Sequence, residues 1–146
     1  MKRFFEQHSR HLPERMFGIV ADLADYPRFI PNCSAMEVRP DPAGDGNTKL
    51  AKMTLRFGPI TQSYTSRVVA DLVAKSITAK AVDGPFAYLD SVWLFEPEGQ
   101  GTRVRFEIDF KISNPLVAAV AEPAFSAKQD EIMRAFADEA DRRFGD

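Results

Sequence analysis

The sequence has very few of the residues that build disulfide scaffolds, metal centres and membrane spans. Its 146 residues include one cysteine, Cys33, and two histidines, His8 and His11. A lone cysteine forms no internal disulfide, which excludes a stapled secreted scaffold and favours a reducing compartment. No apolar run approaches the ~20 residues that span a bilayer. We therefore expect a soluble protein that touches a membrane only from outside.

An excess of charge of one sign is also lacking. Nineteen Lys and Arg against 21 Asp and Glu leave a formal net charge of −2. This balance supplies no global basic field for holding nucleic acid or anionic lipid. A local basic patch is still compatible with it.

Catalytic and metal-binding motifs are missing as well. The chain contains no His-Glu-x-x-His, no Gly-x-Ser-x-Gly and no phosphate-binding glycine loop. His8 and His11 are expected on opposite faces of one strand, where they cannot share a metal ion. Glu107 and Asp109 alternate with apolar residues and are expected to face water, and Cys33 is expected to pack as a small hydrophobe. We predict no catalytic and no metal-ligating residue.

The N-terminal part reads as a strand followed by two short helices. Residues 2–11 form the strand, and Pro13 opens an amphipathic helix whose apolar residues recur at helical spacing. Residues 25–31 form a second, very short helix. Asp25 is placed to cap it, and Pro31 prevents its extension.

From Asn32 to Ile112 the apolar pattern changes to a period of two, which predicts six strands and a sheet of about seven with the first. Turn chemistry divides these strands at 40–47, 58–59, 74–75, 83–85 and 99–101. Alternation places one set of residues on a common inner face. These are Ala51, Met53, Leu55, Phe57, Tyr64, Ser66, Val68, Leu89, Ser91, Trp93, Phe95, Val104, Phe106, Ile108, Phe110 and Ile112.

The C-terminal part reads as one long helix. Asn114 is a capping residue, Pro115 suits the first helical position, and the helical period runs to about Arg143. Pro123 is expected to kink it. The stripe that faces the sheet comprises Phe125, Ile132, Met133, Phe136 and Ala140.

The widths of these elements predict a curved sheet. Seven strands at ~4.8 Å spacing are roughly 34 Å wide, whereas one helix is about 10–12 Å across. The sheet must therefore curl around the helix and enclose an apolar interior, in an α+β fold. Whether side chains fill this interior or leave a cavity stays open. The inward hydroxyls of Tyr64, Ser66 and Ser91 bond either to neighbouring groups or to a ligand.

The sixth strand is apolar on both faces, since Val92 and Leu94 alternate with Trp93 and Phe95. This pattern indicates a covered outer face, an edge contact or an exposed patch.

Several segments of the chain, in order and over nearly its whole length, match motifs of a known family. The sequence resembles the coenzyme Q-binding branch of the START-like, polyketide-cyclase superfamily, which lies close to a ribosome-association toxin branch. The segments that carry the resemblance are 12–22, 25–33, 64–68, 82–86, 93–97 and 125–136. The Asp83-Gly84-Pro85-Phe86 turn together with the Tyr26-Pro27-x-Phe29-Ile30-Pro31 segment is its most specific part.

The resemblance implies a single START-like domain over residues 1–146 with a helix-grip fold and a lipid-sized tunnel. We expect the tunnel to be lined by Met53, Leu55, Phe57, Tyr64, Ser66, Ser91, Trp93, Phe95, Phe106, Ile108, Phe110, Phe125, Met133 and Phe136. For an entrance at a bilayer we expect contacts from Phe86, Leu116 and Val117. The protein would be cytoplasmic or peripheral at the inner face of the membrane.

The implied function is non-enzymatic binding of ubiquinone or a similar prenyl lipid, as a carrier or chaperone that supports respiratory complexes. No cofactor other than this bound lipid is expected. One alternative is a toxin or regulator that binds the large ribosomal subunit, and another is a cyclase, dehydratase or hydrolase acting in the tunnel. The motifs are shared between branches, so they transfer the fold better than the function. The oligomeric state stays open.

Overall fold

The computed structural model describes residues 1–44, 46–57 and 59–145, without the side chains of Phe57 and Ile60. Its strands are β1 (Lys2–Ser9), β2 (Cys33–Pro40), β3 (Thr48–Phe57), β4 (Ile60–Asp71), β5 (Ser76–Ala81), β6 (Phe86–Glu98) and β7 (Gly101–Ile112). Its helices are α1 (Pro13–Ala21), the 3₁₀ turn η1 (Leu23–Asp25), α2 (Tyr26–Phe29) and α3 (Pro115–Phe144).

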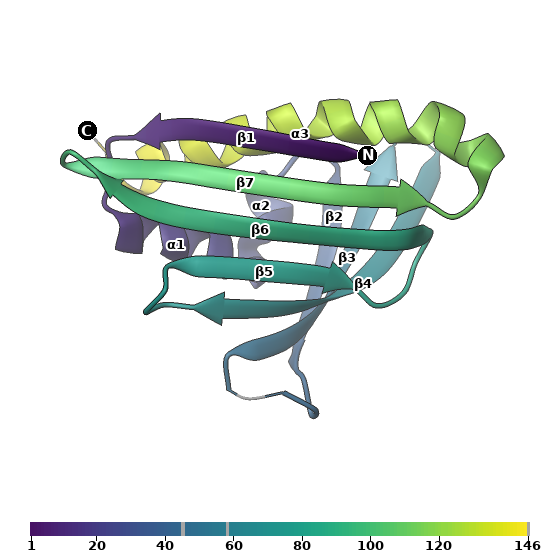
Figure 1. Ribbon diagram of the computed structural model, residues 1–146, viewed down its shortest axis with the longest axis horizontal. Coiled ribbons are helices and arrows are strands. Elements are labelled where there is room, and N and C mark those ends of the chain that lie inside the picture. The colour runs from purple at the N-terminus through teal and green to yellow at the C-terminus, as the bar shows by residue number, and fades with distance from the viewer. Residues whose placement is uncertain (45, 58, 146) are drawn as a thin grey trace.

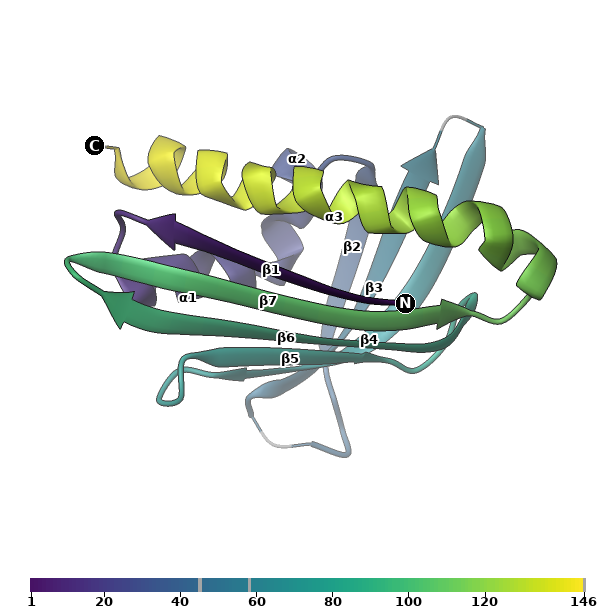
Figure 2. The ribbon, with the colours of Figure 1, turned by 45° about the horizontal axis from the view of Figure 1, so that its top comes forward.

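The seven strands form one antiparallel sheet in the order β1-β7-β6-β5-β4-β3-β2. Figure 1 shows that β1, β7, β6 and β5 run together while β2 and β3 cross them steeply, so the sheet is strongly curved. α3 lies across one face of this sheet, and α1 and α2 lie on the same side (Figure 2). The expected α+β helix-grip architecture is confirmed.

Local sequence explains where the elements begin and end. The Asn114 side-chain oxygen accepts a hydrogen bond from the backbone N–H of Leu116 at 2.9 Å, which caps α3 as predicted. α3 continues through Pro123 as one helix. Before β6, Gly84 has φ +105°, and a Cβ there would lie 2.5 Å from Cβ of Tyr64. Only glycine therefore lets this turn pack against Tyr64.

The alternation of the strands is confirmed by burial. Along β7, Val104, Phe106, Ile108 and Phe110 are buried, whereas the residues between them are exposed or half-buried. The inner face of the sheet and the buried side of α3 enclose the hydrophobic core together with α1. At the described residues the predicted inner-face pattern therefore holds.

Two local expectations at the N-terminal part are wrong. β1 ends at Ser9 instead of residue 11, and His11 is buried beyond it, with Nε2 2.8 Å from Oδ1 of Asp141. Asp25 makes no side-chain cap on α2. Its carboxylate instead accepts hydrogen bonds from Arg28 and Arg143, because two guanidinium groups outcompete a backbone N–H.

Candidate functional site: a cavity between the sheet and α3

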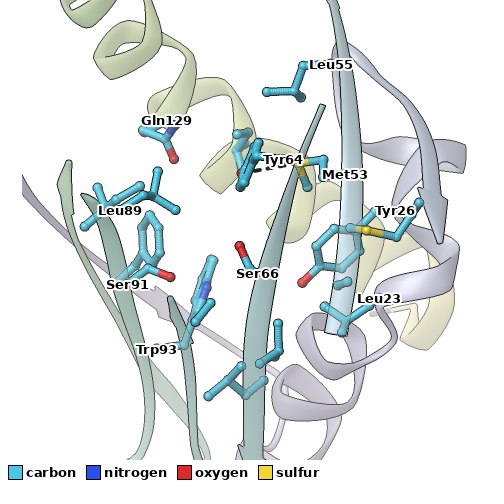
Figure 3. Close-up of a pocket in the computed structure, with 18 of the residues that line it drawn as sticks. Leu23, Tyr26, Met53, Leu55, Tyr64, Ser66, Leu89, Ser91, Trp93 and Gln129 are labelled. Carbon is cyan, nitrogen blue, oxygen red and sulfur yellow. Dashed lines mark hydrogen bonds between the residues drawn. The ribbon is translucent and has the colours of Figure 1, made fainter. Parts of the chain in front are cut away.

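A cavity of about 130 Å³ lies between the inner face of the sheet and the helices (Figure 3). Its lining comes from β2 to β7, from η1 and α2, and from α3. The residues are Leu23, Tyr26, Met36, Ala51, Met53, Leu55, Tyr64, Ser66, Val68, Ile77, Ala79, Leu89, Ser91, Trp93, Phe106, Ile108, Phe125, Gln129, Ile132 and Phe136. The sequence did not decide whether side chains fill the interior, and the structure shows that they leave a cavity.

Aromatic rings form one wall of this cavity. The Trp93 ring stacks on Phe106 with centroids 4.3 Å apart and meets the edge of Phe136 at 5.1 Å. Phe136 in turn meets Tyr26 edge-on at 5.4 Å. Because each ring is held by two or more others, this wall is rigid and offers flat apolar surface to a planar ligand.

A few polar groups interrupt the apolar lining. Within the described chain, neither Ser66 nor Ser91 has a hydrogen-bond partner for its hydroxyl, and both line the cavity (Figure 3). The Gln129 amide nitrogen donates to the Phe125 carbonyl at 3.2 Å, and Figure 3 shows the Gln129 side chain extending from α3 on the side of Leu89 and Ser91. Such groups can orient a ligand that carries carbonyl oxygens.

The two tyrosines at the cavity are protonated at neutral pH. Burial raises the pKa of Tyr64 to about 12, and burial likewise raises the pKa of Tyr26. The Tyr26 hydroxyl donates to the Val20 carbonyl, whereas the Tyr64 hydroxyl has only a weak acceptor, Sδ of Met53 at 3.6 Å. The Tyr64 hydroxyl can therefore donate its hydrogen bond to a stronger acceptor, such as a carbonyl oxygen of a ligand, in place of the Met53 sulfur.

Ten predicted lining residues lie at the cavity: Met53, Leu55, Tyr64, Ser66, Ser91, Trp93, Phe106, Ile108, Phe125 and Phe136. Three others pack elsewhere. Phe95 meets Phe17 of α1 edge-on at 5.9 Å, Phe110 fills the space beside Phe125, and Met133 is buried on α3 away from the lining. Alternation predicts the face of a strand but not the position of a void along it. The side chain of Phe57 lies outside the described residues.

Sequence reasoning missed several lining residues, of which Tyr26 and Gln129 matter most because they are polar. Gln129 lies four residues after Phe125 and four before Met133, so helical spacing could have placed it on the inward stripe. Tyr26 had no such signal. It reaches the cavity only because η1 and α2 fold back over the sheet.

Phe86 does not take the position expected of a membrane contact. Its half-buried ring packs against Tyr64 at 5.2 Å and Phe125 at 5.5 Å, since the Gly84 turn folds it inward. The other two predicted contacts are exposed, Leu116 at 85% and Val117 at 50%. Val120, 78% exposed, extends this apolar surface, which we call the α3 tip.

Carboxylates and imidazoles lie away from the cavity. Within the described residues its lining includes no carboxylate and no imidazole, and no cluster of three His, Cys, Asp or Glu that could hold a metal ion is present there. The arrangement can bury an apolar ring and form hydrogen bonds with its polar substituents.

Among the described residues, none of the helices has the length and hydropathy that a membrane span requires.

A buried ion cluster fixes the helices that form the cavity roof. The Glu139 side chain is only 3% exposed and accepts hydrogen bonds from Arg142 at 2.8 Å, from Arg143 at 2.6 Å and from Arg28 of α2. The hydrogen bond from Arg142, followed by those from Arg28 and Arg143, lowers the pKa of Glu139 despite its burial. Tyr26 and Phe136 are thereby held in place, because α2 is tied to α3.

A curved antiparallel sheet that grips a long helix around an internal apolar cavity defines the helix-grip class of ligand-binding proteins. The chain belongs to the polyketide cyclase/dehydrase and lipid transport family, whose model matches residues 10–137. The resemblance inferred from the sequence is confirmed.

Curated relatives divide between two descriptions. The chain is 30% identical to the ribosome association toxin RatA of Pseudomonas aeruginosa, over 95% of this chain and 96% of that protein. It is 27% identical to the protein of the same description in Rickettsia prowazekii, over 89% and 91%. It is 28% identical to the mitochondrial coenzyme Q-binding protein coq10 of Schizosaccharomyces pombe, over 88% and 79%.

Solved structures share the fold. The 18 kDa protein CC1736 of Caulobacter crescentus superimposes with a TM-score of 0.80 at 26% identity, over 100% of this chain and 99% of that one. An aromatase/cyclase of a Streptomyces species superimposes with a TM-score of 0.84 at 14% identity, over 99% and 96%. At that identity the second likeness describes the fold alone.

Proposed function

We propose that this protein binds the ring of ubiquinone or a similar prenyl quinone in the cavity between the sheet and α3, without catalysing a reaction. The observation that carries the proposal is the cavity itself, which combines apolar walls with the unpaired hydroxyls of Ser66 and Ser91. A quinone offers a flat apolar ring and two carbonyl acceptors, which match these features. The similarity to a coenzyme Q-binding protein supports the same ligand class.

The size of the cavity limits what enters it. A dry apolar cavity of ~150 Å³ can hold a benzene ring, so about 130 Å³ suits a single six-membered ring and not a polyprenyl chain. The tail must therefore leave the cavity. We infer that it leaves beside Phe125 toward the α3 tip, where Leu116, Val117 and Val120 can contact the bilayer as a peripheral anchor. Lipid carriage to respiratory complexes would follow from this access.

Filling the cavity tests the proposal. Ala79→Leu adds three carbons at a lining position of β5, and Thr78→Leu adds bulk on the exposed outer face of the same strand. A short-tailed ubiquinone analogue should quench the fluorescence of Trp93, the single tryptophan, in the parent and in Thr78→Leu. Affinity should fall about tenfold or more in Ala79→Leu, because the space for the ring is gone.

Thermal unfolding of both variants serves as the control for folding. Ala79→Leu should melt no lower than the parent, because it fills a void. The proposal would be overturned by a parent that shows no quenching, or by a stably folded Ala79→Leu that binds the analogue as tightly as the parent does.

The similarity to ribosome association toxins supports a second candidate function, binding to the ribosome. Co-sedimentation with ribosomal subunits across a salt series tests it, and recovery of the protein only in the free fraction at low salt would contradict it. A cyclase or dehydratase reaction is supported by the fold alone and is not proposed.

A further inference from the structure

Exposed cations without ion-pair partners gather on the outer face of β2 and β3. Arg39, Lys52 and Arg56 are exposed, and within the described residues none of them forms an ion pair. Arg67 on β4 adds a fourth exposed cation, whose Nε lies 2.7 Å from the buried carboxylate of Asp41. We call these four residues the cationic face.

The register of the strands sets the spacing of this face. Arg39 and Arg67 both lie opposite Leu50, one on each side of β3. With strands ~4.8 Å apart, their Cα atoms are separated by about 10 Å across the sheet. Lys52 and Arg56 are four residues apart on β3, which corresponds to about 13 Å along the strand. The face therefore presents charges at intervals on a rigid backbone.

The rest of the outer face is different, because most of its charges are neutralised locally. On β1 and β7, Lys2 pairs with Glu107 at 2.8 Å and Arg103 with Glu98 at 2.8 Å. Lys111, near the end of β7, is an exception and forms no ion pair with another described residue. The net charge of −2 therefore conceals an uneven distribution. Arg39, Lys52 and Arg56 together face only one exposed carboxylate across the strands, that of Glu37.

The side chains between these cations are hydroxylic. Thr54 and Ser63 face outward and share a hydrogen bond at 2.8 Å, and Thr61 is exposed opposite Arg56. Arg, Lys, Ser and Thr are the side chains that contact phosphate and sugar groups of nucleic acids. A membrane surface would favour apolar residues among the cations. The most exposed large apolar residues lie outside the cationic face, on the α3 tip and at Leu72 and Val73 in the turn between β4 and β5.

We propose that the cationic face binds the sugar-phosphate backbone of structured RNA. This inference rests on the second candidate function and specifies its surface and its chemistry. Contacts of this kind bring no sequence preference and weaken steeply with salt, because each neutralised phosphate releases counterions. The cavity opens on the other side of the sheet, so quinone binding is independent of this face.

Charge reversal on the cationic face tests the proposal. The test variant is Lys52→Glu/Arg56→Glu. The matched control is Lys111→Glu/Arg134→Glu, which reverses two exposed cations on β7 and α3 that form no ion pair with any described residue. Binding to isolated large ribosomal subunits and to a 30-base-pair RNA duplex is measured between low and physiological salt. We expect the test variant to bind both at least tenfold more weakly than the parent, with a salt slope reduced by about two, and the control to bind within about twofold of the parent.

The outcomes separate the surface from the function. If the parent binds ribosomal subunits and the test variant binds them equally well, the cationic face is wrong while ribosome binding stands. If the parent binds neither subunits nor duplex RNA at low salt, both fail. If both double variants lose affinity equally, binding follows overall charge and the proposal is again overturned. Quenching of Trp93 by the quinone analogue, unchanged in the test variant, shows that this variant is folded.

Discussion

At the scale of single residues, Glu139 is a buried carboxylate that forms ion pairs with three arginines. Its carboxylate is buried on α3 and receives hydrogen bonds from Arg28, Arg142 and Arg143. Two of these cations follow it at helical spacing, and the third comes from α2, 111 residues earlier. The residue therefore joins a helix to the segment that places Tyr26 over the cavity.

Replacing Glu139 by glutamine should lower the free energy of unfolding by about 2–3 kcal/mol at pH 7, because three guanidinium groups lose a buried counter-charge. Urea denaturation measures the change. Glu131→Gln on the same helix is the control, since its ion pair with Lys128 is far more accessible to solvent than Glu139 and contributes less than about 1 kcal/mol. Equal stabilities of the two variants would contradict this role for Glu139.

At the scale of elements, α3 has two unequal halves. Its C-terminal half is held by the Glu139 cluster and by Asp141, which lies 2.8 Å from His11 and 3.1 Å from Arg10. Its first turns, from Pro115 to Ala124, are mostly exposed and include Pro123, which removes one helical hydrogen-bond donor. The half that borders the proposed lipid exit is the less restrained one.

Hydrogen exchange should therefore differ along α3. Amides of residues 117–124 should exchange at least tenfold faster than those of residues 133–142, because local opening there disrupts few buried contacts. Mass spectrometry of peptides from the two halves measures this difference. Equal protection along the whole helix would show that α3 opens only as a unit.

At the scale of the whole molecule, ion pairs join distant parts of the chain. Asp41 with Arg67 ties the loop after β2 to β4. Asp25 pairs locally with Arg28 and also with Arg143 of α3, and Glu139 with Arg28 ties α2 to α3. In each case the arginine hydrogen bonds lower the pKa of the carboxyl group. Each carboxylate is thus more acidic in the folded protein than in the unfolded chain.

Stability should therefore fall in acid. A carboxyl group with a lowered pKa in the folded state stabilises the fold at pH values above its unfolded pKa, here 3.8 for Asp and 4.5 for Glu. That contribution is lost progressively as the pH falls below about 4.5. Urea midpoints measured from pH 7 to pH 3 should stay level down to about pH 5 and then decrease. A midpoint at pH 3 equal to that at pH 7 would contradict the argument, and Glu139→Gln should show a smaller decrease than the parent.

The amino-acid sequence by itself determined the elements and their faces. Asn114 and Pro115 begin α3, glycines and prolines separate the strands, and the period of two assigns Trp93 and Phe106 to the inner face. These signals are local, since capping and alternation act over a few residues. The width of seven strands against one helix then required the sheet to curve.

Only the tertiary structure decided how the interior and the surface are used. The void of about 130 Å³ depends on which rings meet, so Phe95 and Phe110 pack while Trp93 borders open space. Tyr26 reaches the cavity because Glu139 binds Arg28 across 111 positions of sequence. The cationic face exists because strand register separates some cations from carboxylates and pairs others. Packing and charge pairing act between residues far apart in the chain, and so no local pattern encodes them.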